Sequence, residues 1–366
     1  MRVLVDYRPA LRQRTGVGEF ARALAAALLR VLADGDRLTL FSSSWKDRLQ
    51  PSPLPGADVV DRRIPVLLLN FAWHRLEWPP VEALAGRIDV AQSVHPLLLP
   101  ARRAARFVTI HDLDFLDHPE RASAEMRRDY PRLVRSHARR ADGILVPSAY
   151  TASQVVSRLG VEPERLTVFP PVTAEVRPRP EPPAGGPILF VGTLEPRKNV
   201  AGLVAGYDRL LAMVPDAPRL VLAGKPTLGA DHLVDAPPAV ASRIEARGYV
   251  SDEERARLYH AASMLVLPSL EEGFGLPVVE AMAAGLPVIV SNRGSLPEVA
   301  GEAALVIDPQ DPAALASAML RVLTEAGLRR QMIESGFRRA RSFDAVVAAG
   351  RVLAAYRAAA ARRSPS

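Results

Sequence analysis

The chain has 366 residues, of which 48% are hydrophobic and 24% charged, which is typical of a folded protein of two domains. It has no cysteine, which excludes disulfides and thiolate metal sites and favours a reducing compartment. Only 5% of the residues are aromatic, and the net charge of +7 comes without the basic-aromatic interleaving of a nucleic-acid-binding surface. The start, MRVLVDYRP, reads as a buried strand rather than a signal peptide, and no apolar run is long enough to span a membrane. We therefore expect a cytoplasmic protein with no nucleic-acid partner.

Short apolar runs alternate with helical patterns along the first half. Amphipathic helices are expected over 17–33 and 121–141. The apolar runs that read as buried parallel strands are 2–6, 37–41, 89–93, 107–112 and 143–148. Alternation of this kind predicts βαβ units and a doubly wound α/β sheet.

The same rhythm resumes after RPRPEPPAGGP (177–187), a stretch rich in proline and glycine that reads as a linker. The second series of strands is expected at 187–192, 219–224, 264–269, 287–291 and 304–308. The sequence thus predicts two Rossmann-like domains, 1–175 and 176–344, with a last helix over 345–366 that packs back on the first domain.

The segment 268–291, PSLEEGFGLPVVEAMAAGLPVIVS, carries the strongest chemical signal. A loop with Glu272, Gly273 and Gly275 separates a strand from a helix expected to begin near Leu276, whose first amides can bind an anion. Glu280 follows Glu272 after seven intervening residues, about one turn inside that helix. The two carboxylates can grip hydroxyls at opposite ends of one extended ligand; two solvated glutamates are the alternative.

A second segment, FVGTLEPRKN (190–199), places Arg197 and Lys198 after the glycine turn that follows a strand. Two adjacent cations at this position can neutralise a diphosphate and stabilise the charge on a leaving nucleotide. The alternative is a pair of solvated helix cations. The lysine stands out because the chain has only three, among 47 basic residues.

The first half adds two glycines and a histidine. Gly16 and Gly18 follow the first strand at an expected helix start, but their spacing is not that of a GxGxxG dinucleotide loop. His111 ends a strand, at the sheet edge where ligands bind in doubly wound folds; a structural histidine is the alternative. Asp112 and Asp114 form a D-x-D that we interpret as structural or acceptor-facing, and the remaining histidines show no metal-ligand spacing.

Together these residues resemble the retaining glycosyltransferases of the GT-B fold, in family 4. The likeness covers nearly the whole chain, is most specific from Gly192 to Asp308, and is carried by the glutamate pair and by the Arg-Lys turn. The opening VDYRPALRQRTGVGEFARAL is similar to bacterial polysaccharide mannosyltransferases. The resemblance implies two Rossmann-like domains that face each other across a cleft.

The resemblance also implies roles for single residues. Glu272 is expected to contact the transferred sugar near its 3-hydroxyl, Glu280 to hold the ribose, and His111 to bond the 6-hydroxyl region. Asp252 falls where the nucleotide-base loop lies, and the loop at Gly16 and Gly18 covers the donor phosphates. Backbone groups expected to donate to the sugar and the phosphates belong to Gly273, Phe274, Gly275 and Leu276.

The expected reaction is retaining transfer from a nucleotide-diphosphate sugar to an acceptor hydroxyl in bacterial glycan or polysaccharide synthesis, without a metal or other cofactor. GDP-mannose is the favoured donor and a UDP-sugar the next. Two alternatives are a sugar-nucleotide 2-epimerase of the same fold and a non-catalytic nucleotide-sugar-binding subunit. The former is not expected to combine the glutamate pair with Arg197 and Lys198, and the intact set argues against the latter.

A stripe of arginines bears on where in the cell the protein acts. Four arginines of the expected helix over 121–140 recur at spacings of four, three and four, which places them on one helical face: Arg128, Arg132, Arg135 and Arg139. Pro131 is expected to kink or divide this helix. Besides a solvated face, the stripe suggests peripheral contact with the anionic inner face of a membrane and a lipid-linked sugar acceptor.

Overall fold

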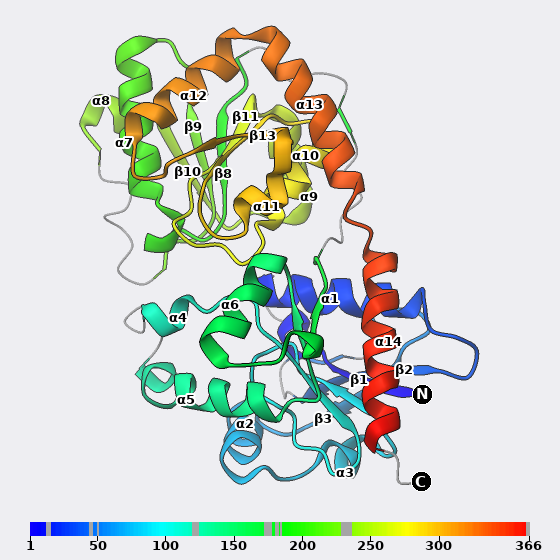
Figure 1. The fold of residues 1–366 in the computed structure, drawn as a ribbon. Helices are drawn as coiled ribbons and strands as arrows, with labels where there is room; N and C mark the ends of the chain where they lie inside the picture. The colour runs from blue at the N-terminus through cyan, green and yellow to red at the C-terminus, as the bar shows by residue number, and fades with distance from the viewer. Residues whose placement is uncertain are drawn as a thin grey trace. The chain divides into compact units, whose positions relative to one another are not determined.

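The computed structural model describes residues 1–11, 16–43, 47–49, 51–118, 124–171, 178–179, 183, 185–227 and 236–363, and gives no side chains for 124–129. It separates into two compact units, each described here by itself (Figure 1). Unit 1 comprises Met1–Thr173 with Asp344–Ser366, and unit 2 comprises Ala174–Phe343. The boundaries expected from the sequence, after residues 175 and 344, fall within two residues of these. Residues 177, 180–182 and 184 of the expected linker lie outside the described residues.

Unit 1 is built on a seven-stranded sheet in which every neighbouring pair is parallel, in the order β3-β2-β1-β4-β5-β6-β7. The strands are β1 (Arg2–Asp6), β2 (Arg37–Ser43), β3 (Asp58–Arg62), β4 (Val90–Gln92), β5 (Ala105–Thr109), β6 (Gly143–Val146) and β7 (Leu166–Val168). The strand order reverses between β1 and β4. Ligands of such sheets bind beyond the carboxyl ends of the strands at this point.

Helices cover both faces of this sheet because its strands are apolar on both sides. Val3 and Val5 of β1 belong to a core with α1 and α14, whereas Leu4 packs with Phe41 and Trp73 on the other face. The helices of the first face are α1 (Gly16–Leu29) and α14 (Ala345–Arg363). Those of the second face are α2 (Val66–Phe71), a π-helical turn η2 (Ala72–Leu76), α3 (Val81–Ala85), α5 (Ala124–Arg140) and α6 (Ala149–Leu159). The described part of the unit also has three short elements: η1 (Arg8–Leu11), α4 (Asp114–Asp117) and η4 (Pro163–Arg165).

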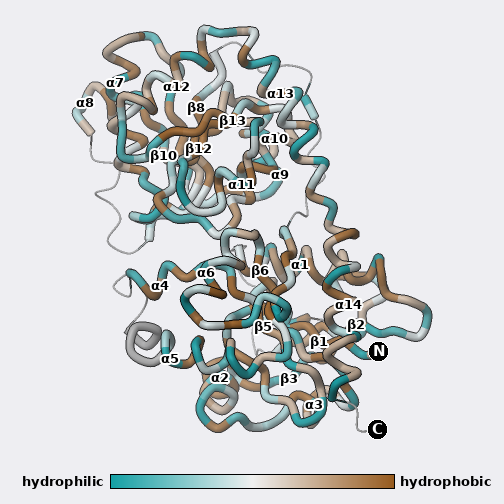
Figure 2. The backbone as a smooth tube through the Cα atoms, in the orientation of Figure 1, coloured by the Kyte–Doolittle hydropathy of each residue, from teal (hydrophilic) through white to brown (hydrophobic). Residues whose placement is uncertain are grey.

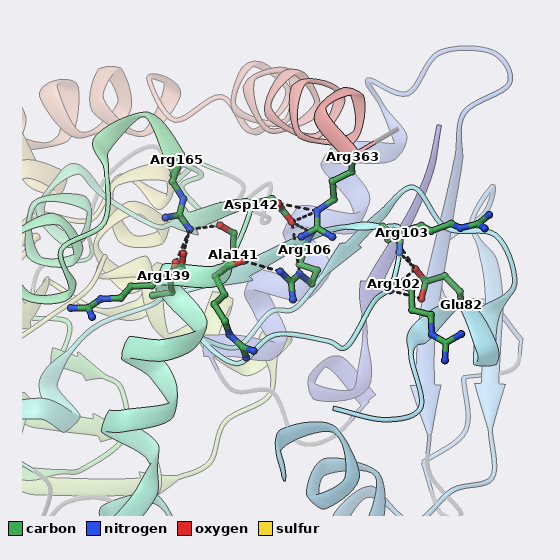
Figure 3. A network of polar contacts seen from close by, with 12 residues as sticks. Glu82, Arg102, Arg103, Arg106, Arg139, Ala141, Asp142, Arg165 and Arg363 are labelled. Atoms are coloured by element: carbon green, nitrogen blue, oxygen red, sulfur yellow. Dashed lines mark hydrogen bonds and ion pairs between the residues drawn. The ribbon is translucent and has the colours of Figure 1, made fainter. Parts of the chain in front are cut away.

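The C-terminal helix α14 is part of unit 1. Its Tyr356 is fully buried and donates a hydrogen bond of 2.7 Å to Gln92 Oε1 of β4. At its end, Arg363 pairs with Asp142, which also accepts from the backbone amide of Arg106 at the start of β5 (Figure 3). The last helix thus completes the core of the first sheet, and Tyr356 lies 264 residues after Gln92 in the chain.

Unit 2 repeats the architecture with six parallel strands in the order β10-β9-β8-β11-β12-β13. These are β8 (Ile188–Val191), β9 (Leu220–Ala223), β10 (Ile244–Gly248), β11 (Met264–Leu267), β12 (Val288–Ser291) and β13 (Ala304–Ile307). The helices that matter below are η5 (Pro196–Lys198), α7 (Val200–Met213), α9 (Asp252–Ala261), α10 (Leu276–Ala284), α11 (Leu296–Ala300), α12 (Pro312–Thr324) and α13 (Ala326–Arg341). Brown, apolar residues gather on the central strands in Figure 2. The order reverses between β8 and β11.

Three strands escape sequence-based prediction, and all three lie at or next to a sheet edge: β3, β7 and β10. Edge strands are partly exposed and carry charges, as in DVVDR and IEARG, so they lack an apolar run. Pro131 does not divide the helix, because α5 continues through it and Val134 and Ala138 anchor it in the core. Within the described ranges, no helix is both long and apolar enough to cross a membrane.

Candidate active site

The site of unit 2 lies where the strand order of its sheet reverses. β8 leads through Gly192 into the 3-10 turn η5, and its neighbour β11 leads through a loop into α10. Because β8 and β11 are hydrogen-bonded neighbours, their two following segments meet at the same edge. The contact is direct, since the amide of Leu270 donates a 2.7 Å hydrogen bond to the carbonyl of Arg197.

Lys198 and Glu272 form the centre of this site. The ammonium of Lys198 bonds Glu272 Oε2, which also accepts a 3.3 Å hydrogen bond from Ser269 Oγ. Arg197 lies with Nη1 4.0 Å from Glu272 Oε1 and is held by Glu195, whose carboxylate is 2.8 Å from its Nε. The structure thus gathers two cations and one of the two predicted glutamates at one place.

The carboxylate of Glu272 is largely buried, with 12% of its side chain exposed. Burial alone raises its pKa, but Lys198, Arg197 and the hydrogen bonds from Lys198 and Ser269 outweigh it, and the net pKa is lowered. Glu272 is therefore ionised at neutral pH. It is a fixed hydrogen-bond acceptor with two oxygens, suited to hydroxyl groups of a ligand.

Two glycines shape the loop that carries Glu272. Gly294 has φ +60°, and a Cβ there would lie 2.6 Å from the backbone N and O of Glu272. Gly275 has φ +90° and directly precedes the first helical residue of α10, Leu276. Both positions require a left-handed backbone that only glycine adopts readily. The predicted helix from Leu276 to near Gly285 is confirmed, and its amino end opens at the same sheet edge as Lys198.

Glu280, the second predicted glutamate, is held by helix α9. Its side chain is 4% exposed, accepts 2.8 Å from the hydroxyl of Tyr259, and lies 3.0 Å from Arg255 Nη2. Arg255 also pairs at 3.3 Å with Asp252 in the first turn of α9. The structure thereby links Asp252 to Glu280 through one guanidinium, which the sequence did not indicate.

Tyr259 is the residue of this network most fully removed from water, with 1% exposed. Burial, and then the neighbouring charge of Glu280, raise the pKa of its hydroxyl well above 10, with Arg255 opposing. Tyr259 therefore stays protonated and donates. Sequence reasoning missed Arg255, Tyr259 and Ser269; their signal is only positional, since two of them lie four residues apart on one helix facing α10.

In unit 1 the corresponding edge holds a different cluster. Arg8, just after β1, forms a bidentate pair with the buried Asp6 at 2.7 and 2.8 Å and donates at 2.9 Å to Asn70 of α2. Its guanidinium carbon lies 4.8 Å from the ring centroid of Trp73. Burial by itself raises the pKa of Asp6, but Arg8 and His95 outweigh burial and the net pKa is lowered. This carboxylate is therefore ionised. Neither Asp6 nor Arg8 was selected from the sequence, although Asp6 ends the first strand and Arg8 follows it by two residues.

The histidines of this edge are neutral. Burial lowers the pKa of His95 to about 4 and also lowers that of His111. His111 Nε2 lies 3.0 Å from the carbonyl of Val94, which can only accept, so Nε2 carries the hydrogen. The Nδ1 of His111 keeps its lone pair and can accept a hydrogen bond. Its ring meets that of Phe20 edge-on at 4.9 Å.

The other residues of unit 1 that were selected from the sequence lie at or near the start of a helix. Gly16 begins α1 and is exposed, whereas a Cβ on Gly18 would lie 2.8 Å from the carbonyl of Pro9 in η1. Asp112 accepts from the amide of Asp114 at 3.3 Å, in the first turn of α4. In the part of the chain that the structure describes, no three His, Cys, Asp or Glu residues cluster as metal ligands.

Comparison with known proteins agrees with this geometry. Residues 14–173 match the family described as glycosyltransferase family 4, and residues 186–325 match glycosyl transferases group 1. These two domains, with two cations and an ionised carboxylate at the reversal point of the second sheet, fit a GT-B glycosyltransferase. The chain belongs to the family 4 glycosyltransferases.

Three relatives illustrate the likeness. The O-antigen chain mannosyltransferase B of Escherichia coli is 31% identical over 370 residues, which cover 94% of this chain and 96% of that protein. The MMP alpha-(1->4)-mannosyltransferase of Mycolicibacterium hassiacum is 32% identical, covering 62% of this chain and 56% of that protein. Among solved structures, sucrose-phosphate synthase of Thermosynechococcus elongatus covers 99% of both chains with a TM-score of 0.74 at 22% identity, which shows the common fold.

Proposed function

We propose that this glycosyltransferase moves mannose from GDP-mannose to an acceptor hydroxyl, with retention at the anomeric carbon. The observation that carries the proposal is the cluster of Arg197, Lys198 and Glu272 at the reversal point of the second sheet. Mannose is supported by the two relatives named as mannosyltransferases. A UDP-sugar is the next donor to test.

The donor is bound in unit 2 in this proposal. The ionised Glu272 accepts from hydroxyls of the sugar, and Glu280 accepts from the ribose, with Tyr259 and Arg255 holding its carboxylate. Asp252 lies beside the nucleotide end of the donor through its pairing with Arg255. The backbone of Gly273, Phe274, Gly275 and Leu276 faces the sugar and phosphates. The ring of Phe274 packs on Phe343, so only its backbone is assigned to the ligand.

The transfer needs no metal in this proposal, because Arg197 and Lys198 supply positive charge where a diphosphate departs. The bond from the anomeric carbon to the phosphate oxygen breaks while the acceptor oxygen bonds the same face of the carbon. The acceptor proton passes to the departing phosphate. Activity is therefore expected to persist in EDTA, and an activity that EDTA abolishes and Mn²⁺ restores contradicts this mechanism.

Unit 1 is assigned to the acceptor side. His111 offers the lone pair of Nδ1 to a hydroxyl of the donor sugar, near its 6-position, and the amino end of α1, at Gly16 and Gly18, is assigned to the phosphates. The acceptor is a glycan or a lipid-linked sugar. We place the enzyme in the cytoplasm, in peripheral contact with the anionic inner face of a membrane.

A thermal-shift panel of GDP, UDP, ADP and their sugars tests the donor directly, since a bound ligand raises the melting temperature by mass action. GDP and GDP-mannose are expected to give the largest shifts. A larger shift with UDP or a UDP-sugar replaces the donor assignment. Proton NMR of the product distinguishes a retained α-anomer from an inverted one.

Two other functions share the fold. A sugar-nucleotide 2-epimerase converts the donor without an acceptor, so incubation with donor alone and analysis for an epimer identifies it. A non-catalytic binding subunit shifts in the thermal panel but transfers nothing to any acceptor. The intact set of Arg197, Lys198, Glu272 and Glu280 favours the transferase over both.

A further inference from the structure

The exposed apolar side chains of this protein are concentrated on one segment of unit 1. Of the nine large apolar residues that are exposed in the described chain, five lie between residues 66 and 78, on α2, η2 and the turn that follows. They are Leu67 (81% exposed), Leu68 (60%), Phe71 (58%), Leu76 (63%) and Trp78 (63%). Scattered exposed apolar residues are ordinary, whereas a contiguous group of this kind marks an interaction surface. We name these five residues the apolar patch.

The orientation of the apolar patch is fixed by the opposite side of the same helix. Leu69 and Trp73 are buried against Leu4 and Phe41, and Trp73 Nε1 donates at 2.9 Å to the carbonyl of Pro79. Asn70 accepts from Arg8. The segment is therefore anchored in the core, and its outward face is presented rigidly rather than by a loose loop.

Positive charge surrounds the apolar patch. The sequence from 62 to 78 has three arginines, Arg62, Arg63 and Arg75, and a single acidic residue, Glu77. Glu77 pairs with Arg140 at 2.7 Å, which brings the end of α5 beside η2, as Figure 1 shows for α2 and α5. Four exposed arginines of α5 extend the charge, with no acidic residue between 130 and 140: Arg132, Arg135, Arg139 and Arg140.

Several of these arginines are held by carbonyl oxygens rather than carboxylates. Arg135 donates to the carbonyl of Arg158 and Arg139 to that of Leu159, both at the end of α6, and Arg62 donates to Leu84. A carbonyl oxygen fixes a guanidinium without neutralising it. Arg62, Arg135 and Arg139 therefore keep their positive charge. Arg128 is the first residue of the expected stripe, and its side chain lies outside the described part of the structure.

We infer that the face formed by the apolar patch and the arginines of α5 docks on an anionic lipid bilayer. Leu67, Leu68 and Phe71 enter the boundary between headgroups and acyl chains, Trp78 lies at that boundary, and the arginines contact the headgroups. A second copy of the chain fits less well, because a two-fold interface would set this arginine-rich rim against its own copy. An anionic surface supplies the complementary charge instead.

The docking surface has a consequence for the substrate. Through Asn70 and Arg8, α2 is tied to the carboxyl edge of the first sheet, where its strand order reverses. A lipid-linked acceptor that sits in the bilayer would present its sugar near this edge. The choice of a lipid-linked acceptor rests on the proposed transferase function, whereas the docking itself does not.

Vesicle co-sedimentation tests the inference with the full chain. Vesicles of phosphatidylglycerol and phosphatidylcholine are compared with phosphatidylcholine alone, at low and at high salt. The wild type is expected to sediment with anionic vesicles at low salt and less at high salt, because salt screens the arginines. The variant Leu67→Gln/Leu68→Gln/Phe71→Gln is expected to lose about tenfold or more in partition, since each apolar side chain that leaves water contributes to binding. A variant Arg63→Gln/Arg132→Gln is expected to bind anionic vesicles less tightly at low salt and to show a smaller salt dependence than the wild type.

The matched control is Met213→Gln/Val347→Gln, which changes exposed apolar residues outside the patch and is expected to bind vesicles like the wild type. Three results overturn the inference: wild type that stays in the supernatant at low salt, a triple variant that sediments like wild type, or a wild-type dimer that the triple variant abolishes without vesicle binding. A GDP thermal shift on every variant separates the two proposals. Absence of that shift in the wild type contradicts the donor site alone and leaves the vesicle result standing.

Discussion

The two sheets of this protein have the same core strand order but opposite chemistry where that order reverses. In unit 2 the edge between β8 and β11 gathers full charges, with Arg197 and Lys198 facing Glu272 and with Arg255 facing Glu280. In unit 1 the edge between β1 and β4 has one closed ion pair, Asp6 with Arg8, and two neutral imidazoles, His95 and His111.

The difference shows that the fold sets the place of a site and the side chains set its ligand. A cationic turn beside a helix amino end suits a diphosphate. Neutral hydrogen-bonding rings beside an apolar helix suit hydroxyls of an uncharged sugar. Four predictions test this contrast between the two units.

Lys198→Ala is expected to have the largest effect, because it removes a charge that stabilises the leaving diphosphate. Loss of one preorganised donor costs about 10²-fold or more in turnover, and Arg197→Ala is expected to act similarly. Steady-state transfer assays measure this. Arg321→Ala, which breaks an exposed ion pair with Glu325 on α12, is the control and is expected to leave turnover unchanged. Equal turnover in Lys198→Ala and wild type would remove this residue from the mechanism.

Glu280→Ala and Glu272→Ala are expected to separate binding from turnover. A hydrogen bond to a charged group contributes about 1.5–3 kcal/mol, so loss of the ribose contact weakens GDP binding by about ten- to a hundredfold. Glu272→Ala is expected to lower turnover while GDP still binds. Titration calorimetry with GDP and UDP measures both. Wild-type affinity of the Glu280 variant for both nucleotides would disprove the ribose assignment.

Acid is expected to destabilise unit 1 before unit 2. Burial lowers the pKa of His95 and of His74 to about 4 from an ordinary 6.5, so the unfolded chain takes up protons first as the pH falls through this window. The free energy of unfolding of unit 1 therefore falls between about pH 6.5 and 4. The lowered pKa of Glu272 contributes stability to unit 2 above 4.5, which is lost only as the pH falls through that lower pKa.

Scanning calorimetry from pH 7 to 5, with and without GDP, measures this order. GDP is expected to raise the transition of unit 2, which identifies it, while acid lowers the other transition first. His95→Gln is expected to flatten the pH dependence of that other transition. A GDP-sensitive transition that falls first would contradict the contrast between the two units.

Tyr259→Phe is expected to have the smallest effect. It removes one of the groups that hold Glu280, and a typical hydrogen bond contributes about 1 kcal/mol, so the GDP affinity is expected to fall by about fivefold. The matched control is Tyr207→Phe, whose hydroxyl donates at 2.9 Å to the carbonyl of Pro218 in the same unit. The control is expected to lower the melting temperature without changing affinity. If Tyr259→Phe binds GDP as tightly as Tyr207→Phe, Tyr259 is not needed to position Glu280.

Sequence alone predicted the fold because buried parallel strands are nearly continuous apolar runs and helices interrupt them. It also selected Lys198 and Glu272, because each follows such a run at a short distance along the chain. The ion pair between them could be anticipated only by assuming that β8 and β11 are neighbours, since 74 positions separate the two residues.

The rest depends on tertiary packing. Arg255 and Tyr259 read as ordinary helix residues until α9 packs on α10 and turns them toward Glu280. The run VLLLNFAW (66–73) is almost wholly apolar, and the structure buries its Leu69 and Trp73 and exposes its Leu67, Leu68 and Phe71. Contacts with distant residues such as Phe41 and Arg8 decide which side of this apolar helix packs on the sheet. These contacts cannot be predicted from the local sequence.

The position of α14 determines when unit 1 can finish folding during synthesis. Residues 1–173 of unit 1 leave the ribosome before any part of unit 2. The core of unit 1 is completed only by Ala348, Val352 and Tyr356 of α14, which are made last. At a synthesis rate of about 5–20 residues per second, the nascent strands wait on the order of ten seconds for that helix. Meanwhile the apolar surface under α14 has no cover, so the second unit of the chain is the first that can fold completely.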